Sequence, residues 1–357
     1  MVNVSYLDTK DAVDGVDKSN LCDILRGIPK QLEVAADEFE KVPIPESWKR
    51  VREVVFCGMG GSAIGGEIAT DLPAKLQRKP LHVVREYELP EFVGPESLVV
   101  TVSYSGETEE ALACFREARA RGCILAVVTG GGILATEAIA ARATLYQFNF
   151  QAPPRDALGY LFAPLLRILV GAAVLEPKEA NLSPAITTAQ ELVLKLVPEV
   201  PTVQNRAKEL AYLFYDHVPM IIGSGLTRSV ARRWKGQFNE HSKAIATFDV
   251  LPEANHNTVE GLQFPTRFSD DAVVMILRSS YDHPEVVKRF NFLEQFLSTR
   301  HIAWHEPKLN LGQQDLWSEK LTLVTLGDWV SYYLALLYRV DPEPVPAIME
   351  LKNKLRG

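Results

Sequence analysis

The glycine-rich run FCGMGGSAIGGEIATD, at residues 56–71, constrains this chain more than any other feature. Val51–Phe56 before it turns fully apolar and predicts a buried parallel strand, and the residues after the glycines predict a helix. Glycines let the backbone of the turn come close to a ligand, and the new helix points free N–H groups toward it. The run therefore predicts an anion-binding turn, with Gly60, Gly61 and Ser62 as its contacts.

A second predicted strand, residues 96–103, leads into the turn SYSGET at 103–108 and then into a helix at 109–121. The two turns follow adjacent strand ends, so we expect their amides and hydroxyls to lie together. Hydroxyls can donate hydrogen bonds to every oxygen of a phosphate monoester without any buried cation, so the set favours such a ligand. The four hydroxyls belong to Ser62, Ser103, Ser105 and Thr108.

Two other interpretations of the glycine run are open. Gly58, Gly60 and Ala63 fit the G-x-G-x-x-A pattern of dinucleotide-binding folds. Arg85 and Glu86, after the next predicted strand, are the groups that would meet the ribose of such a cofactor. The run would otherwise be a tight turn that binds nothing. The hydroxyl-rich second turn favours a phosphate monoester over both.

The bulk composition excludes some classes of protein. A chain of 357 residues is too long for one typical core and predicts about two domains. Its net charge of −7 argues against a nucleic-acid partner. The cysteines form no CxxC pair, so we expect small core residues in a reducing compartment and no disulfides. They are Cys22, Cys57, Cys114 and Cys123.

We expect a cytoplasmic protein without a membrane span. The first residues, MVNVSYLDTKDAVD, have neither the basic start nor the apolar run of a signal peptide. Residues 157–175 are the one stretch long enough to cross a membrane, but Pro164 and Arg167 lie in its middle. We therefore expect a buried or dimer-facing helix there.

From residue 51 onward, predicted strands alternate with helical spans. This pattern predicts an α/β fold whose parallel sheets are covered by helices on both faces. Val218–Ile222 ends in GSG, much as the first strand ends in its glycines, which indicates a tandem duplication. We expect a helical segment at 1–50, one domain at 51–198 and a second at 199–357.

The second half also has a counterpart of the hydroxyl-rich turn. Val273–Leu277 is followed by RSSYDH, in the place where SYSGET follows the first-half strand. Arg278, Ser279 and Asp282 are poor phosphate ligands beside the hydroxyls of the first half. We therefore expect the phosphate site in the first half and the reacting groups in the second.

The turns GGSAIGG and SYSGETEE resemble those of sugar isomerase (SIS) domains. Within that superfamily the chain is similar to the bifunctional phosphoglucose/phosphomannose isomerases through PRDALGY, GSGLTRSVARRWKGQFNE and PEANHNTVEG, at residues 154–160, 223–240 and 252–261. The resemblance implies two tandem SIS domains in a homodimer whose active site lies at the subunit interface. It also implies interconversion of glucose 6-phosphate or mannose 6-phosphate with fructose 6-phosphate through a cis-enediol, with no cofactor.

Such an isomerisation needs a base that moves a proton between C2 and C1, and a group that stabilises the enediolate. In the resembling isomerases the glutamate of the NE motif is the base, which implies Glu240 here. The resemblance places the PR arginine, Arg155, beside the base, where its permanent charge would offset the enediolate. The structural alternatives are a solvated helix end for Glu240 and a salt bridge of Arg155 with Asp156.

Opening of the sugar ring needs a group that titrates near neutrality. The resemblance implies His256, given by the neighbouring subunit of a dimer, whereas a histidine in a loop would otherwise be structural. Lys352 resembles a lysine that joins this histidine, and Lys354 is its near neighbour. Glu343 stands where the family pattern has a threonine, and this departure bears on glucose versus mannose specificity.

No metal site is expected. His301 and His305 are four residues apart, but the residues between them suit a strand end, with no further ligand nearby. A sugar-phosphate-binding regulator is the alternative function from another class. The acidic net charge and the lack of a DNA-binding motif argue against it.

Overall fold

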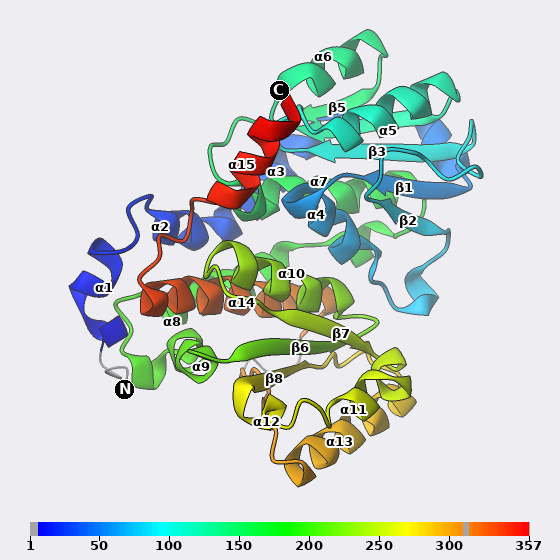
Figure 1. The fold of residues 1–357 in the computed structure, drawn as a ribbon. Coiled ribbons are helices and arrows are strands. Elements are labelled where there is room, and N and C mark those ends of the chain that lie inside the picture. The colour runs from blue at the N-terminus through cyan, green and yellow to red at the C-terminus, as the bar shows by residue number, and fades with distance from the viewer. Residues whose placement is uncertain (1–5, 310–313, 357) are drawn as a thin grey trace. The chain divides into compact units, whose positions relative to one another are not determined.

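The computed structural model describes residues 6–309 and 314–356. The chain divides into two compact units. We call Gly27–Thr187 the central unit, and the residues before and after it together form the terminal unit. Each unit contains one parallel sheet, so the predicted α/β fold is confirmed (Figure 1). The domain boundaries at 50/51 and 198/199 were predicted from the pattern of strands and helices in the sequence, and they stay a prediction.

The sheet of the central unit has five parallel strands. They are β1 Glu53–Cys57, β2 Leu81–Val84, β3 Ser97–Ser103, β4 Ile124–Thr129 and β5 Thr144–Gln147, in the order β2-β1-β3-β4-β5. β3 is buried along its whole length, as expected when helices cover both faces. The order reverses between β1 and β3, and ligands of open α/β sheets bind at such a point, outside the carboxyl ends of the strands.

Helices cover both faces of the central sheet (Figure 1). They are α3 Ile28–Glu40, α4 Gly60–Thr70, α5 Glu109–Ala120, α6 Gly132–Ala140, α7 Leu158–Gly171 and the start of α8, Ser183–Leu196. α5 and α6 pack on one face, where Phe115 and Leu134 form an apolar cluster with Val127 of β4. α4 and α3 both pack against α7. Just before α7, the Asp156 carbonyl oxygen accepts from the side-chain amide of Gln31 in α3 (Nε2–O 2.9 Å).

The terminal unit repeats the central arrangement. Its four parallel strands are β6 Val218–Ser224, β7 Thr247–Leu251, β8 Ala272–Leu277 and β9 Ala303–His305. Their order, β7-β6-β8-β9, matches β2-β1-β3-β4 and so supports the tandem duplication. The sequence did not predict β7, because it is an edge strand whose residues are mostly half-buried and form no long apolar run.

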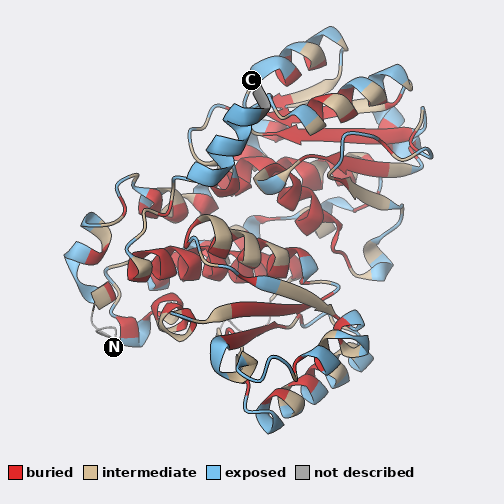
Figure 2. Ribbon diagram, in the orientation of Figure 1, coloured by how far each residue is buried: buried red, intermediate tan, exposed pale blue. Residues whose placement is uncertain are grey.

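Helix α14, Leu316–Tyr338, lies at the core of the terminal unit. It is long and apolar enough to cross a membrane, but 94% of its most apolar 18-residue window is buried, so it is a core helix. Figure 2 shows it red along nearly its whole length. The expectation that residues 157–175 are the one stretch of such length is therefore wrong, since α7 has only 14 residues; its burial is confirmed.

The other helices of the terminal unit surround α14 and the sheet. α9, Arg206–Phe214, and α10, Arg228–Glu240, both pack against α14. The remaining helices are α1 Lys10–Asp14, α2 Leu21–Arg26, α11 Thr258–Gly261, α12 Phe268–Asp271, α13 Pro284–Thr299 and α15 Pro346–Arg356.

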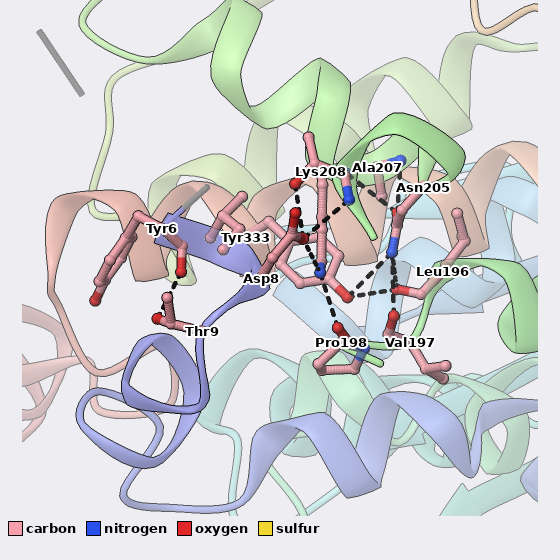
Figure 3. Close-up of polar contacts among 12 residues, drawn as sticks. Tyr6, Asp8, Thr9, Leu196, Val197, Pro198, Asn205, Ala207, Lys208 and Tyr333 are labelled. Carbon is pink, nitrogen blue, oxygen red and sulfur yellow. Dashed lines mark hydrogen bonds and ion pairs between the residues drawn. The ribbon is translucent and has the colours of Figure 1, made fainter. Parts of the chain in front are cut away.

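Buried polar contacts attach the first residues of the chain to the terminal unit (Figure 3). The Lys208 side chain is fully buried, and its Nζ donates to Asp8 Oδ1 and to the Pro198 carbonyl oxygen, both at 2.8 Å. The carboxylate of Asp17 accepts from the N–H groups that begin α2 and from the Tyr332 hydroxyl of α14 (3.0 Å). A buried charge needs a partner, so these contacts explain why residues 6–26 fold with the second half.

Candidate active site

The two predicted turns meet at the carboxyl edge of the central sheet. The Ser62 hydroxyl, in the first turn of α4, accepts a hydrogen bond from the Tyr104 N–H after β3 (3.1 Å). Gly60 has the left-handed conformation (φ +49°) that favours glycine. Gly61 lies so close to the Arg155 backbone that a Cβ at position 61 would be 2.6 Å from the Arg155 backbone nitrogen. The glycines therefore let the first turn approach both the second turn and Arg155.

Three of the four predicted hydroxyls keep a proton to donate. The oxygens of Ser62, Ser105 and Thr108 each accept a hydrogen bond from within the two turns, at 3.1 Å. None of the three donates to another residue in the described part of the chain. A hydroxyl that accepts a hydrogen bond still has its own proton, so these groups can donate to an oxyanion.

Ser103 is bonded differently. It is fully buried, donates to Thr108 Oγ1 and accepts from the Gly106 N–H, both at 3.1 Å. Its hydroxyl proton is thus used inside the turn. This bonding suits a residue that holds the shape of the turn.

Substituting Gly106 with alanine is expected to destabilise the second turn. Gly106 is left-handed (φ +69°), and a Cβ there would overlap the carbonyl oxygen of Gly131. Gly122 has nearly the same backbone (φ +71°) with no atom within 4 Å of a Cβ, so Gly122→Ala is the matched control. In urea unfolding, Gly106→Ala should lose about 1–3 kcal/mol more than the control, because only it adds a steric overlap. Equal losses would show that the turn can relax without strain.

The contacts of Arg85 do not favour a dinucleotide at these turns. Arg85 is the cation that would meet a ribose phosphate, but it is ion-paired with Glu67 of α4. Its side chain is 24% exposed and that of Glu67 is 10% exposed. A cation held in this way is poorly placed for a second anion.

A buried thiol, Cys57, ends β1 directly before the first glycine of the run. The pKa of Cys57 is raised, first by its hydrogen bond with Cys114 and then by burial. Cys57 is therefore a protonated core group rather than a nucleophile. All four cysteines are free and buried.

Arg155 is buried beside the glycine run, with 4% of its surface exposed. It belongs to the short 3-10 helix η4, Pro154–Asp156, and its Nε lies 3.3 Å from Asp156 Oδ2. The salt bridge that was the alternative to a catalytic role is thus present. A guanidinium has five N–H donors in a fixed fork, so this ion pair does not exclude contact with an anionic ligand.

Glu240 is the last residue of α10 and is half-buried. Two contacts hold α10 to α14: in the middle of α10, Asp328 accepts from Arg233 (Nε–Oδ1 3.0 Å), and directly after its end His241 contacts Ser331 (Nδ1–Oγ 2.9 Å). They fix the backbone from which the Glu240 side chain extends. The sequence did not indicate Asp328 and Ser331, because they lie in a mostly apolar stretch without a polar motif.

Glu240 and His256 lie toward opposite ends of the terminal sheet. α10 links the parallel strands β6 and β7, so it runs opposite to them and ends near their amino edge. β7 returns to the carboxyl edge, and His256 follows it, exposed, at the end of the 3-10 helix η7, Glu253–His256. A five-residue strand rises by about 17 Å, which separates the two side chains along the strand direction. The terminal unit of one chain therefore does not bring them together.

The two candidate lysines lie on α15. Lys352 is exposed, and Lys354 is ion-paired with Glu350 one turn earlier (Nζ–Oε1 2.6 Å). Before this helix, the Glu343 N–H donates to Asp341 Oδ1 (3.2 Å). Of the two lysines, Lys352 is the one without an ion pair in the part of the chain that the structure describes.

No group of three or more metal-ligating side chains is found within residues 6–309 and 314–356. His301 lies in a turn with φ +57°, and His305 ends β9. Burial, followed by the nearby charges of Arg206 and Lys308, lowers the pKa of His305. A neutral histidine that is half-buried in a strand suits a packing role.

Comparison with known proteins identifies the family. The bifunctional phosphoglucose/phosphomannose isomerase of Caldicellulosiruptor bescii is 34% identical over 329 residues, which are 92% of this chain and 96% of that protein. The chain belongs to the bifunctional phosphoglucose/phosphomannose isomerase family. The relative of the same name from Aquifex aeolicus is also 34% identical, over 92% of this chain and 98% of that protein. Residues 203–355 match the family described as the bacterial phospho-glucose isomerase C-terminal SIS domain.

A solved structure supports the same fold. A glucose-6-phosphate isomerase like protein from Thermus thermophilus superposes with a TM-score of 0.61 at 21% identity, over 95% of this chain and 98% of that chain. At this identity the likeness concerns the fold alone. The resemblance seen in the sequence motifs is confirmed by the family match, and the chain is an SIS-domain enzyme of the isomerase class.

Proposed function

We propose that this protein interconverts glucose 6-phosphate, mannose 6-phosphate or both with fructose 6-phosphate. The observation that carries the proposal is the pair of joined turns, whose three hydroxyl protons are available to a ligand. Their chemistry fits the phosphate monoester of a sugar. The names of the relatives from Caldicellulosiruptor bescii and Aquifex aeolicus describe isomerases of two such sugar phosphates, which supports the same substrate class.

In this proposal the phosphate group binds at the N-terminal end of α4 and in the turn after β3. The first helical N–H groups and the positive end of the helix dipole attract the anion, while the hydroxyls orient it. In this proposal Ser103 holds the shape of the turn through its hydrogen bonds with Thr108 and Gly106. The phosphate contacts are Gly60, Gly61, Ser62, Ser105 and Thr108.

Glu240 would act as the base. Its carboxylate takes the proton from C2 of the ring-opened aldose and returns it to C1, so that a cis-enediol converts to the ketose. The positive charge of Arg155 stabilises the enediolate oxygen. Only protons move in this reaction, so acid and base side chains are sufficient for it, and the proposal includes no cofactor.

His256 would open the sugar ring, assisted by Lys352. Because one terminal unit does not bring Glu240 and His256 together, we propose that the histidine comes from a second copy of the chain. The active site would then lie at the subunit interface of a homodimer. We also propose a cytoplasmic location, which the four free and buried cysteines support.

A coupled assay of fructose 6-phosphate formation tests the function. We expect turnover of glucose 6-phosphate, mannose 6-phosphate or both, with exchange of the C2 proton for deuterium in heavy water. Calorimetric binding of fructose 6-phosphate without turnover of either aldose would instead support a sugar-phosphate-binding regulator.

Replacing Ser105 with alanine should raise KM for the sugar phosphates. The hydroxyl is exposed, and the Glu107 N–H that it accepts can bond to water instead, so the fold should be unaffected. Loss of one hydrogen bond to a charged group weakens binding by about 1.5 kcal/mol, or roughly tenfold. Ser183→Ala, at an exposed serine that begins α8, is the control and should keep the wild-type KM. An unchanged KM in Ser105→Ala would remove this residue from the phosphate site.

A further inference from the structure

The terminal unit contains a copy of the proposed phosphate-binding turn. β8 is followed by residues 278–283 and then by α13, as β3 is followed by residues 104–108 and then by α5. In both sheets this strand pairs with the first strand of the repeat, β6 or β1. The copied turn contains two serines, Ser279 and Ser280, each with an amide and a hydroxyl donor.

A carboxylate of the same chain occupies these donors. Glu319, in the first turn of α14, accepts from the Ser280 N–H through Oε1 (2.6 Å). Its Oε2 accepts from the hydroxyls of Ser279 (2.9 Å) and Ser280 (3.3 Å). One carboxylate thus receives three hydrogen bonds from two neighbouring serines, which is how a strand-to-helix turn holds an oxyanion.

A second carboxylate takes the remaining amide. Asp282 Oδ2 accepts from the Ser279 N–H (2.8 Å). Both amides and both hydroxyls of the serine pair are therefore bonded to carboxylates of the chain itself. The central turn differs, because the hydroxyls of Ser105 and Thr108 donate to no residue that the structure describes.

A cavity of about 310 Å³ lies beside the Glu319 carboxylate. This volume is at the lower end of the range for small-molecule sites. Ser280 and Arg278 are among its lining residues, and Arg278 is already ion-paired with Glu294 and Glu306. Space for an oxyanion therefore exists next to the turn, but its donors are taken.

We propose that Glu319 is an intramolecular substitute for a bound phosphate, which fills the copied turn and restricts phosphate binding to the central unit. The inference rests on the proposed function, because it takes the central turn as the phosphate site. It explains why a chain that contains two such turns would bind one sugar phosphate instead of two. The ligand class that would replace the carboxylate is a small oxyanion, such as inorganic phosphate.

The charges around the copied turn strengthen this exclusion. Burial raises the pKa of Glu319, and the charge of Asp282 raises it further, while the serine hydrogen bonds lower it. Burial also raises the pKa of Asp282. Two carboxylates in one half-buried turn repel any further anion, so the test must remove both charges.

The test counts the phosphate ions bound per chain in the full-length protein. Calorimetry with inorganic phosphate should give one per chain for the wild type and for Asp282→Asn, in which Glu319 still fills the turn. The double variant Asp282→Asn/Glu319→Ala should bind two. Adding Ser279→Ala to the double variant should return the number to one.

The outcomes separate this inference from the proposed function. A double variant that binds no more phosphate than Asp282→Asn would overturn the role of Glu319 and leave the central site untouched. If the wild type binds no phosphate and the double variant binds one, the central turns are not the phosphate site, but the role of Glu319 is supported. If the double variant unfolds, its refolding by added phosphate would support the inference, and unfolding unaffected by phosphate would contradict it.

Discussion

Replacing Glu240 with glutamine is expected to lower kcat for the sugar phosphates by about 10²-fold or more. Glutamine keeps the size of the side chain but cannot take the proton from C2. The contacts of Asp328 with Arg233 and of His241 with Ser331 hold α10 to α14 without the Glu240 carboxylate, so the fold should survive. The measurement is the coupled assay with each aldose phosphate, with kcat and KM determined separately.

Glu285→Gln is the matched control for this experiment. Glu285 is exposed in the first turn of α13, and its carboxylate contacts Lys288 (2.7 Å). It should keep the wild-type kcat. Deuterium exchange at C2 should be lost together with turnover in Glu240→Gln. Turnover and exchange equal to the wild type would show that another group is the base.

Replacing Asp328 with alanine is expected to lower the free energy of unfolding by about 3–5 kcal/mol. Its side chain is 1% exposed and that of Arg233 is 2% exposed, with 2.8 Å between Oδ2 and Nη2. Without the carboxylate, the Arg233 charge stays buried without this partner, and the Gln237 amide loses an acceptor at 2.9 Å. Urea unfolding followed by circular dichroism measures the loss.

Two further variants define the cause of that loss. Asp271→Ala removes an exposed carboxylate that pairs with Arg267 (3.3 Å), and it should cost about 1 kcal/mol or less. Arg233→Met combined with Asp328→Leu should recover most of the stability, because apolar side chains can replace a buried ion pair. A loss in Asp328→Ala no larger than in Asp271→Ala would mean that this pair does not hold α10 to α14.

Both turns of the central unit could be predicted because the information for them is local. The strand before each turn, the glycines at 58–61 and the hydroxyls at 103–108 are contiguous in the chain, and a parallel sheet places successive strand ends on one edge. The family resemblance followed from the same contiguous motifs. The sequence could not show that Ser103 is buried and bonded to Thr108, because both residues read as equivalent hydroxyl donors.

The terminal unit was harder to predict because its contacts join distant segments. β7 is a half-buried edge strand with a weak apolar pattern. In α14, Asp328 and Ser331 lie within a mostly apolar sequence that does not indicate their role. Glu319 reaches Ser279 and Ser280 across about forty positions of chain, with no motif that links them. Side-chain partners of this kind depend on which segments the fold brings together.

By itself the sequence indicated the α/β class, the duplication, the family and the two first-half turns expected to bind phosphate, because periodicity and contiguous motifs encode them. Only the tertiary structure showed which hydroxyls of the central turns still have a proton to donate, and that a carboxylate of the chain fills the copied turn. It also showed that residues 6–26 fold with the second half, through the contacts of Lys208 and Asp17. The physical reason is that burial and hydrogen bonding of a polar group depend on its neighbours in space, and these neighbours lie far apart along the chain.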